Sequence, residues 1–472
     1  MSIKSLGKQS LIYGAGHILA RLVTFILLPV YTNILTQSDF GIISLVYTFL
    51  GFMTVILHYG LDASLLKHYV PAEPKEKKSI LTNAYFSFVI TSLIFSVGLI
   101  LFRHHVSFFL FGAALPKIVM MVAAILFFDV LWAIHVMILR AEEKPIAFVS
   151  TSLLNVCLTL GLNIYFVVYL HEGILGVVKS NLVTSGLLFI GSFPVLFSRI
   201  SLASLSKAKW KKMMKFGMPF LPAGIFSMIL ELSDRYILNY LTDLETVGLY
   251  NAGYKLGMFM LLVAMGFNMG WQPYFLKKSP DDTGYISKIT TAVLFLMGFF
   301  WFLLALWTKD LVRLQFGNYS FFGEEYWAAV NIVPFVAGAY VFHGMYLLQL
   351  PGVYLKEKPS WIALVRGLGA ISNIGLNFML IPIYGIMGAA LATCISFFLM
   401  AVFLFFINKQ IFPINYEWKN IIVIFITALG FYFLSINVEL SFLQKLLMSL
   451  SFPVILLLLG VVRIKDLKTI AN

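Results

Sequence analysis

Charged residues and cysteine are both scarce in this chain of 472 residues. Asp, Glu, Lys and Arg make up 12% of the sequence and hydrophobic residues 60%, with a mean hydropathy of +0.91. An ordinary soluble domain carries about twice that charged fraction, so the composition excludes a soluble protein. The two cysteines, Cys157 and Cys394, lie within long apolar runs and therefore predict neither a disulfide framework nor a metal site.

Two further absences narrow the function. No stretch between apolar runs is long enough for a folded catalytic domain outside a membrane. No Walker motif or other nucleotide-binding loop is present, so an ATP-driven pump is not expected. The N-terminal segment begins with basic residues as a secretory signal does. Its apolar run is too long, contains Arg21 and has no small-residue cleavage pattern, so we expect it to remain as a membrane helix.

Long apolar runs make up most of the chain. Each reaches or approaches the roughly 20 residues that an α-helix needs to cross a bilayer. We therefore predict an all-α polytopic membrane protein with about fourteen transmembrane helices. The expected spans are residues 10–35, 41–65, 80–102, 117–140, 146–170, 173–197, 216–241, 247–271, 287–308, 328–353, 360–383, 385–408, 418–437 and 442–462.

The basic residues indicate how the chain is oriented rather than a nucleic-acid partner. The formal net charge is +13, which in a soluble protein would suggest nucleic acid. Most of the 34 Lys and Arg residues fall in loops on the side of the N-terminus. Those on the opposite side are Arg103, Lys117, Lys309, Arg313 and Lys445. Because cytoplasmic loops carry the excess of Lys and Arg, both termini are predicted to be cytoplasmic.

The remaining basic residues fall inside the predicted spans. A charge near the bilayer centre costs about 2.5 to 3.5 kcal/mol, so these side chains should face protein or a water-filled cavity. They are the candidate substrate-binding residues: Arg21, Lys179, Arg235, Lys255 and Arg366. Each has a structural alternative. Arg21 and Arg235 could pair with acids that fix packing, and the other three lie near span ends, where a long side chain can extend to the headgroups.

Four acidic residues also fall in these spans and are candidates for ion coupling: Asp62, Asp129, Glu231 and Asp234. Glu231 precedes Arg235 by four residues, a spacing that favours an ion pair along one helix. Asp234 points about 100° away from Arg235 and is expected to face another helix.

The sequence repeats itself once. The matched segments are 33–36 with 239–242, 41 with 248, 60–67 with 270–277, 143–145 with 357–359, 161–163 with 375–377, and 173–176 with 385–388. Six spans recur in the same order. We therefore divide the chain into an N-terminal six-helix half (1–206), a C-terminal six-helix half (207–410) and an additional helix pair (411–472). Because six is even, a pseudo-two-fold axis along the membrane normal should relate the halves, and transporters built this way bind substrate between them.

A known family shares this pattern. The two six-helix halves, the Gly-Leu-Asn and Gly-Ile-x-Gly blocks, the Glu-Lys-Pro turns and the opening GKQSLIYGAGHILARLVTFILLPVYTNILTQSDFGIISLVYTF together resemble the bacterial polysaccharide flippases of the O-antigen type. These belong to the multidrug, oligosaccharidyl-lipid and polysaccharide exporter superfamily. The resemblance covers essentially the whole chain, and its motifs are diffuse, so it identifies the family better than the substrate.

The resemblance implies a transporter rather than an enzyme. It would move lipid-linked oligosaccharide, carried on undecaprenyl pyrophosphate, from the cytoplasmic to the outer leaflet of the bacterial inner membrane during lipopolysaccharide biosynthesis. It implies alternating access through a central cavity, which the basic residues above would make cationic, and coupling to an ion such as H+ or Na+ without a bound cofactor. The lipid-linked substrate, membrane lipids and glycan polymerase machinery are the implied partners, and nucleic acid is not.

Four alternatives remain open from the sequence. A cation-coupled multidrug exporter of the same superfamily would favour an acidic cavity. A flippase for the peptidoglycan precursor would share the architecture. A membrane glycan polymerase or ligase would carry a large outer loop, which this chain lacks. A structural role in a glycan-assembly complex would tolerate neutralisation of the buried charges.

Overall fold

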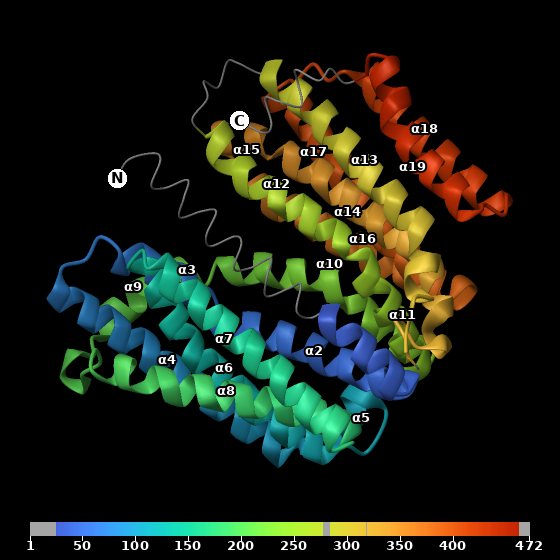
Figure 1. The fold of residues 1–472 in the computed structure, drawn as a ribbon. Helices are drawn as coiled ribbons and strands as arrows, with labels where there is room; N and C mark the ends of the chain where they lie inside the picture. The colour runs from blue at the N-terminus through green and yellow to red at the C-terminus, as the bar shows by residue number, and fades with distance from the viewer. Residues whose placement is uncertain (1–24, 277–283, 318, 462–472) are drawn as a thin grey trace. The chain divides into compact units, whose positions relative to one another are not determined.

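The chain divides into two compact units, Met1–Gly248 and Leu249–Asn472, whose helices are drawn in Figure 1. The structure is a computed structural model, and it describes residues 25–276, 284–317 and 319–461. Among these residues all regular structure is helical apart from one hairpin of two-residue strands. The prediction of an all-α membrane protein is confirmed.

The first unit contains a short helix at Phe25–Ile34 followed by ten helical segments. They are α2 (Gln37–His58), α3 (Leu61–Tyr69), α4 (Pro74–Leu101), α5 (Arg103–Phe111), α6 (Pro116–Ala141), α7 (Pro145–Asn163) with its π-helical continuation η1 (Ile164–Tyr169), α8 (Gly173–Phe197), the 3₁₀ turn η2 (Leu202–Ser204), α9 (Lys207–Gly217) and α10 (Phe220–Leu241). The next helix, α11 (Leu244–Gly257), begins in this unit and continues into the second.

The second unit continues with α12 (Phe259–Phe275), α13 (Gly284–Val312), the strands β1 (Gln315–Phe316) and β2 (Tyr319–Ser320), the 3₁₀ helix η3 (Glu324–Ile332), α14 (Val333–Leu348), α15 (Leu350–Leu355), α16 (Ser360–Tyr384), α17 (Ile386–Ile411), α18 (Trp418–Asn437) and α19 (Phe442–Leu458). The strands pair antiparallel, Gln315 opposite Ser320 and Phe316 opposite Tyr319.

Ten of the described helices are long and apolar enough to cross a membrane, and twelve are if two bent pairs each count as one span. The bent pairs are α9 with α10, at 43°, and α11 with α12, at 41°. Two shorter apolar helices, Phe25–Ile34 and α19, coincide with the first and last expected spans. Together they agree with the expectation of about fourteen membrane helices.

The span expected at 41–65 is not one continuous helix. It is broken between α2 and α3, where Tyr59 and Gly60 adopt left-handed backbone conformations with φ of 32° and 75°. A Cβ at Gly60 would overlap the carbonyl of Gly217, so the break lets two backbones approach closely. Hydropathy did not reveal it because apolar residues continue on both sides of the break.

The two Glu-Lys-Pro turns of the sequence repeat have the same backbone geometry. Glu143 and Glu357 both adopt the left-handed conformation, with φ of 55° and 54°. In each turn the amide of the following lysine donates to the carbonyl five residues earlier, at 2.9 Å. This is the Schellman arrangement that ends a helix. Matched sequence segments therefore fold into matched turns at the ends of α6 and α15.

Gly41 and Gly248, another matched pair, meet each other within the first unit. A Cβ on Gly41 would overlap the carbonyl of Leu244, and one on Gly248 would overlap the carbonyl of Gln37. Each glycine thus faces the residue four positions before its counterpart. The first turns of α2 and α11 pack reciprocally, at a separation that a methyl group would prevent.

Glu142 joins three helix ends of the first unit. It caps the C-terminus of α6, accepts a hydrogen bond of 3.0 Å from the Tyr69 hydroxyl at the end of α3, and forms ion pairs with Arg199, just after α8, and with Lys144. Burial alone would raise the pKa of the Glu142 carboxyl. The hydrogen bonds from Lys144 and Tyr69 and the charge of Arg199 outweigh it, so this pKa lies below its usual value.

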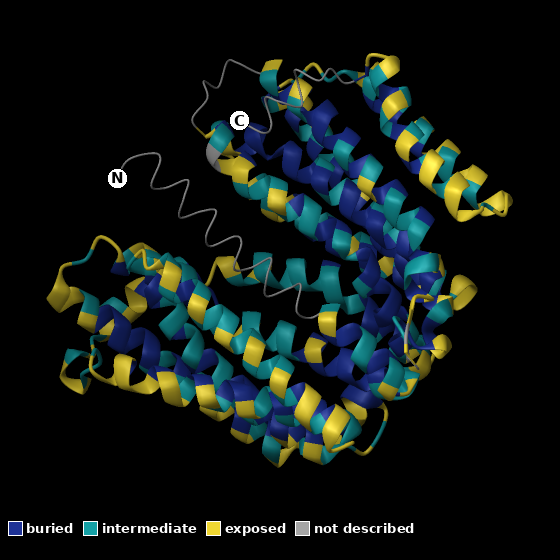
Figure 2. Cartoon of the chain, viewed as in Figure 1, coloured by how far each residue is buried: buried dark blue, intermediate teal, exposed yellow. Residues whose placement is uncertain are grey.

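Apolar side chains cover much of the exterior. Figure 2 shows α18 and α19 with long exposed faces. In α18 only 17% of an 18-residue apolar stretch is buried. Phe433 and Leu458 are 65% and 82% exposed. In water such a surface would aggregate, whereas in a bilayer it faces lipid, as expected for a membrane protein.

Candidate functional site

Arg235 and Asp234 of α10 form the most buried ion pair among the described residues, with side chains 5% and 1% exposed. An Arg235 guanidinium nitrogen (Nη1) donates to Asp234 Oδ1 at 2.6 Å and to the backbone carbonyl of Glu231 at 2.7 Å. The backbone amide of Arg235 also donates to Asp234 Oδ1, at 2.9 Å. This amide turns the Asp234 carboxylate back onto its neighbour, which explains why it does not point away as the helical angle predicted.

The sequence spacing predicted a pair between Arg235 and the Glu231 carboxylate. The structure instead gives Arg235 the Asp234 carboxylate and only the backbone oxygen of Glu231. A buried charge requires compensation by a partner and by hydrogen bonds, and Arg235 has both. Asp234 neutralises the charge that Arg235 would otherwise offer to an anionic substrate.

Lys179, the candidate from α8, lies back along its own helix. Its Nζ is 2.6 Å from the carboxylate of Glu172, the residue before α8, and 5.8 Å from the centroid of the Phe166 ring. The side chain is 34% exposed. Lys179 is therefore engaged at the start of its helix, in keeping with the structural alternative for a lysine near a span end.

Asp129 lies on α6 beside a polar cluster of the first unit. It accepts a hydrogen bond of 3.1 Å from the Trp132 indole, and its charge acts on the Tyr47 hydroxyl of α2. That hydroxyl accepts a hydrogen bond of 2.7 Å from Asn181 of α8. Three helices thus contribute polar groups near one half-buried carboxylate, and the Tyr47 side chain of this cluster is 37% exposed.

A second chain of hydrogen bonds lies in the same unit. The Tyr31 hydroxyl donates to Asn163 Oδ1 at 2.7 Å, and Asn163 Nδ2 donates to Ser180 Oγ at 2.7 Å. Asn163 therefore bonds across helices, to Tyr31 and to Ser180 of α8. Tyr31, Tyr47 and Asn181 were missed. Tyr47 lies in the middle of α2, away from the headgroup belts, and a tyrosine at such a position is a usable signal for a polar contact.

Asp62 occupies the first turn of α3, immediately after the break, where its charge acts on His58 of α2. The Nε2 atom of His58 is buried without a hydrogen-bond partner among the described residues. The two side chains lie on either side of the helix break, a position where small backbone rotations would change their separation.

The second unit contains the other two described candidates. Lys255 is half-buried on α11, and Arg366 is half-buried on α16, where its charge acts on His343 and Tyr346 of α14. Arg21, the candidate of the first expected span, lies outside the described residues.

Farther along α16, towards its C-terminus, follow two fully buried asparagines, Asn373 and Asn377. Asn377 Nδ2 donates to the carbonyl of Asn373 at 2.8 Å and to its Oδ1 at 3.0 Å. Asn377 corresponds to Asn163 of the first half, and both asparagines donate to the carbonyl four residues earlier at 2.8 Å. The repeated asparagine therefore makes the same hydrogen bond along its helix in both units.

Each unit thus holds part of the candidate set. The first contains Asp62, Asp129, Lys179, Glu231, Asp234 and Arg235, and the second contains Lys255 and Arg366. The structure brings Asp234 and Arg235 together and engages Lys179 with Glu172. Among the described residues no group of three His, Cys, Asp or Glu side chains is arranged to hold a metal ion.

Comparison with known proteins identifies the family. The family model described as polysaccharide biosynthesis protein matches residues 6–279. The chain belongs to this polysaccharide biosynthesis protein family. The family predicted from the sequence is therefore confirmed.

Relatives of this polysaccharide biosynthesis protein include an uncharacterized membrane protein of Methanocaldococcus jannaschii, 21% identical over 88% of this chain and 86% of the relative. An uncharacterized membrane protein of Haemophilus influenzae is 23% identical over 58% of this chain and 66% of the relative. Both names agree with a multi-span membrane protein.

Two solved structures show which fold this member of the polysaccharide biosynthesis protein family adopts. The lipid II flippase MurJ, in an inward closed conformation, aligns with a TM-score of 0.77 and 17% identity over 94% of this chain and 98% of MurJ. An inward-facing multidrug resistance MATE transporter of the MOP superfamily aligns with a TM-score of 0.67 and 13% identity over 86% of this chain and 98% of the transporter. The chain has the fold of these transporters.

Proposed function

We propose that the protein is a flippase that moves lipid-linked oligosaccharide, of the undecaprenyl pyrophosphate O-antigen type, from the cytoplasmic to the outer leaflet of the bacterial inner membrane. The observation that carries the proposal is the family match over residues 6–279. The similarity in fold to MurJ supports it, because MurJ is named as a flippase for lipid II. We propose a transporter without enzymatic activity.

The buried polar groups suit this task. A diphosphate headgroup cannot pass through hydrocarbon without compensation, so its path must present polar or charged groups. The candidate contacts remain Arg21, Lys179, Arg235, Lys255 and Arg366, of which Lys179 and Arg235 also form ion pairs with carboxylates. Arginine is suited to bidentate contacts with phosphate oxygens.

The membrane potential would favour outward movement. A headgroup with two negative charges gains about 4.6 kcal/mol on crossing a 100 mV potential that is negative inside. We propose alternating access that runs without ATP, with protons or Na+ as coupling ions and Asp129 and Asp62 as the described carboxylates most suited to that role. Membrane lipids and glycan polymerase machinery would be its partners, and both termini would lie in the cytoplasm.

The test uses a strain that lacks the native gene and carries Arg366→Gln, Lys255→Gln or the wild-type chain at matched membrane abundance. The readouts are surface glycan and the lipid-linked glycan retained on the cytoplasmic leaflet. We expect retained lipid-linked glycan and little surface glycan in at least one variant. Lys419→Gln, at an exposed position in the first turn of α18, is the matched control and should behave as wild type.

Other outcomes would point to the rival functions. The likeness in fold to a MATE transporter favours a drug exporter as the second candidate. Resistance to cationic drugs on expression, with normal surface glycan in the deletion strain, would support an exporter and contradict our proposal. Loss of peptidoglycan synthesis in that strain would support a peptidoglycan-precursor flippase instead.

A further inference from the structure

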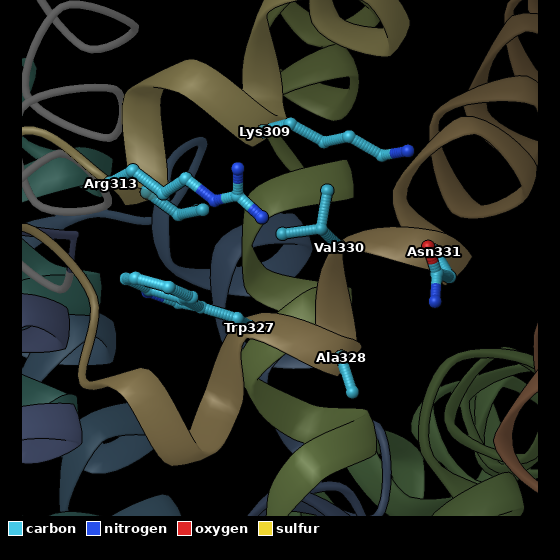
Figure 3. Close-up of a pocket in the computed structure, with 7 residues that line it drawn as sticks. Lys309, Arg313, Trp327, Ala328, Val330 and Asn331 are labelled. Atoms are coloured by element: carbon cyan, nitrogen blue, oxygen red, sulfur yellow. The ribbon is translucent and has the colours of Figure 1, made fainter. Parts of the chain in front are cut away.

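A basic pocket lies within the second unit at the end of α13. It has a volume of about 290 Å³ and is formed by the last residues of α13 together with η3. Figure 3 shows Lys309 and Arg313 extending from α13 above Trp327 and Asn331 of η3. Lys309, Arg313 and Asn331 are exposed, so the polar groups of the pocket are accessible from outside.

The aromatic side of this pocket is held in place by hydrogen bonds. The Trp327 indole donates to the carbonyl of Phe322 at 3.0 Å, which fixes the orientation of the ring. Phe322 itself is fully buried, and its amide donates to the carbonyl of Val312 at 3.1 Å. These two hydrogen bonds connect Trp327 of η3, through Phe322, to the end of α13.

Arg313 uses that fixed ring as a platform. Its guanidinium carbon is 5.0 Å from the centroid of the Trp327 ring, within the range of a cation–π contact. An arginine already ordered by stacking loses less side-chain entropy when it forms two parallel hydrogen bonds to an oxyanion. Lys309 lies one turn earlier on the same helix and adds a second positive charge.

Neither positive charge is neutralised by a neighbouring acid. No ion pair between described residues involves Lys309 or Arg313, whereas the adjacent Asp310 carboxylate is bound by Lys445 at 2.6 Å. Glu324 and Glu325, in the first turn of η3, are both exposed and do not line the pocket. The pocket therefore has a net positive charge and open hydrogen-bond donors.

The placement of these residues is also unusual for a membrane protein. Basic residues are depleted from loops on the outer side, and the chain has few there. Three of them, Lys309, Arg313 and Lys445, come together at this one helix end. Because α13 is a candidate membrane span, its end lies at the level of the lipid headgroups.

We propose that the pocket of Lys309, Arg313, Trp327 and Asn331 is a binding site for a phosphate group carried by a lipid on the outer side of the membrane. Arg313 binds two oxygens of the phosphate, Lys309 neutralises the remaining charge, and the Asn331 amide donates to the adjoining glycerol or sugar. The lipid is either an anionic phospholipid or the prenyl pyrophosphate carrier of the translocated glycan. The proposal goes beyond translocation itself, and only the assignment to the glycan carrier rests on the proposed function.

The test measures binding to the purified full-length chain in dodecyl maltoside, a detergent without phosphate. The probes are dioctanoyl phosphatidylglycerol, farnesyl pyrophosphate and, as the phosphate-free control, dioctanoylglycerol. We expect at least one phosphate probe to bind and Arg313→Gln to weaken it roughly tenfold, the loss of one charge-assisted contact. Arg313→Lys should recover only part of the affinity, because it keeps the charge and loses the planar fork.

Matched controls come from the same side of the membrane. Arg103→Gln and Lys117→Gln remove basic residues of the first unit that are also predicted to lie outside, and they should leave affinity unchanged. If Arg313→Gln lowers the affinity for phosphatidylglycerol alone, the site binds bulk phospholipid. If it lowers the affinity for farnesyl pyrophosphate alone, the site binds the carrier. Equal affinity of wild type, Arg313→Gln and Lys309→Gln for both phosphate probes would overturn the proposal and leave the proposed function untouched.

Discussion

At the level of single residues, the ion pair with Asp234 determines whether the positive charge of Arg235 is available to a substrate. The pair is buried and held by the neighbouring backbone, so removing either partner leaves a charge in the interior. Breaking a buried pair in this way costs about 3 to 5 kcal/mol, whereas replacing both partners by neutral groups is often tolerated. The pair therefore separates a structural role from a transport role by experiment.

We expect Arg235→Gln alone to lower the abundance and thermal stability of the purified protein, because Asp234 is then left without its arginine. The double substitution Arg235→Gln with Asp234→Asn should recover most of that stability. Thermal unfolding of the three proteins measures the coupling. Recovery of stability without recovery of surface glycan would assign the Asp234–Arg235 pair to the transport path, and recovery of both would leave it a packing pair.

Glu142 predicts a dependence on pH. Its pKa is lower in the folded protein than in the unfolded chain, so its contribution to stability is complete above the unfolded value, 4.5, and is lost as the pH falls through the folded pKa. Below pH 4.5 the wild type should lose stability more steeply than Glu142→Gln. Thermal unfolding between neutral and acidic pH measures this difference. Glu143→Gln, an exposed neighbour, is the control, and an equal slope in all three proteins would contradict the prediction.

At the level of elements, the packing of α2 against α11 depends on two glycines. Gly41→Ala and Gly248→Ala each place a methyl group on a backbone carbonyl of the other helix, which can yield only if the helices separate. We expect each to destabilise the protein by about 1 to 3 kcal/mol, the usual cost of overpacking.

Gly98→Ala provides the matched control for these glycines. Gly98 lies in α4 with no atom near the position of an added Cβ. Alanine there should be neutral or stabilise the helix by about 0.5 to 1 kcal/mol. Thermal unfolding and membrane abundance compare the three variants. Similar stability of Gly41→Ala and Gly98→Ala would show that α2 and α11 do not pack this closely.

The sequence predicts helices well and their interruptions poorly. Long apolar runs specify spans because a bilayer requires that length, and the matched segments of the repeat fold alike, as the turns at Glu143 and Glu357 show. The interruptions at Gly60 and Met258 are set by packing, which a hydropathy pattern does not record. The same limit applies to η3 and its hairpin, whose boundaries follow from contacts with α13.

In the candidate site, the local sequence likewise predicts which residues are charged within the spans, whereas tertiary contacts determine their partners. Charge inside an apolar run is visible in the sequence, which is why the candidates from Asp62 to Arg366 can be named without the fold. The partner of Arg235 was not, because an adjacent carboxylate becomes a partner only when the backbone amide turns it. Glu172, the partner of Lys179, lies outside the helix, where helical spacing gives no information.

At the level of the whole molecule, the distribution of Lys and Arg predicts the orientation in the membrane. In a background with Cys157→Ser and Cys394→Ser, we expect Leu314→Cys to react with a membrane-impermeant maleimide in intact cells. Lys211→Cys, on the basic helix α9, should react only after the inner membrane is permeabilised. Labelling with the opposite pattern would reverse the orientation and place both termini outside.

The packing of α10 has a consequence for synthesis of the chain. In the sequence repeat α10 is the first span of the C-terminal half, yet it belongs to the compact unit that ends at Gly248, where its Tyr236 hydroxyl donates to the carbonyl of Leu45 in α2. A ribosome that has translated the whole first half has therefore not yet made the last full helix of the first unit. Until α10 leaves the translocon, nascent α2 lies in the bilayer without it. The surface of α2 that later packs against α10 then contacts lipid or a chaperone.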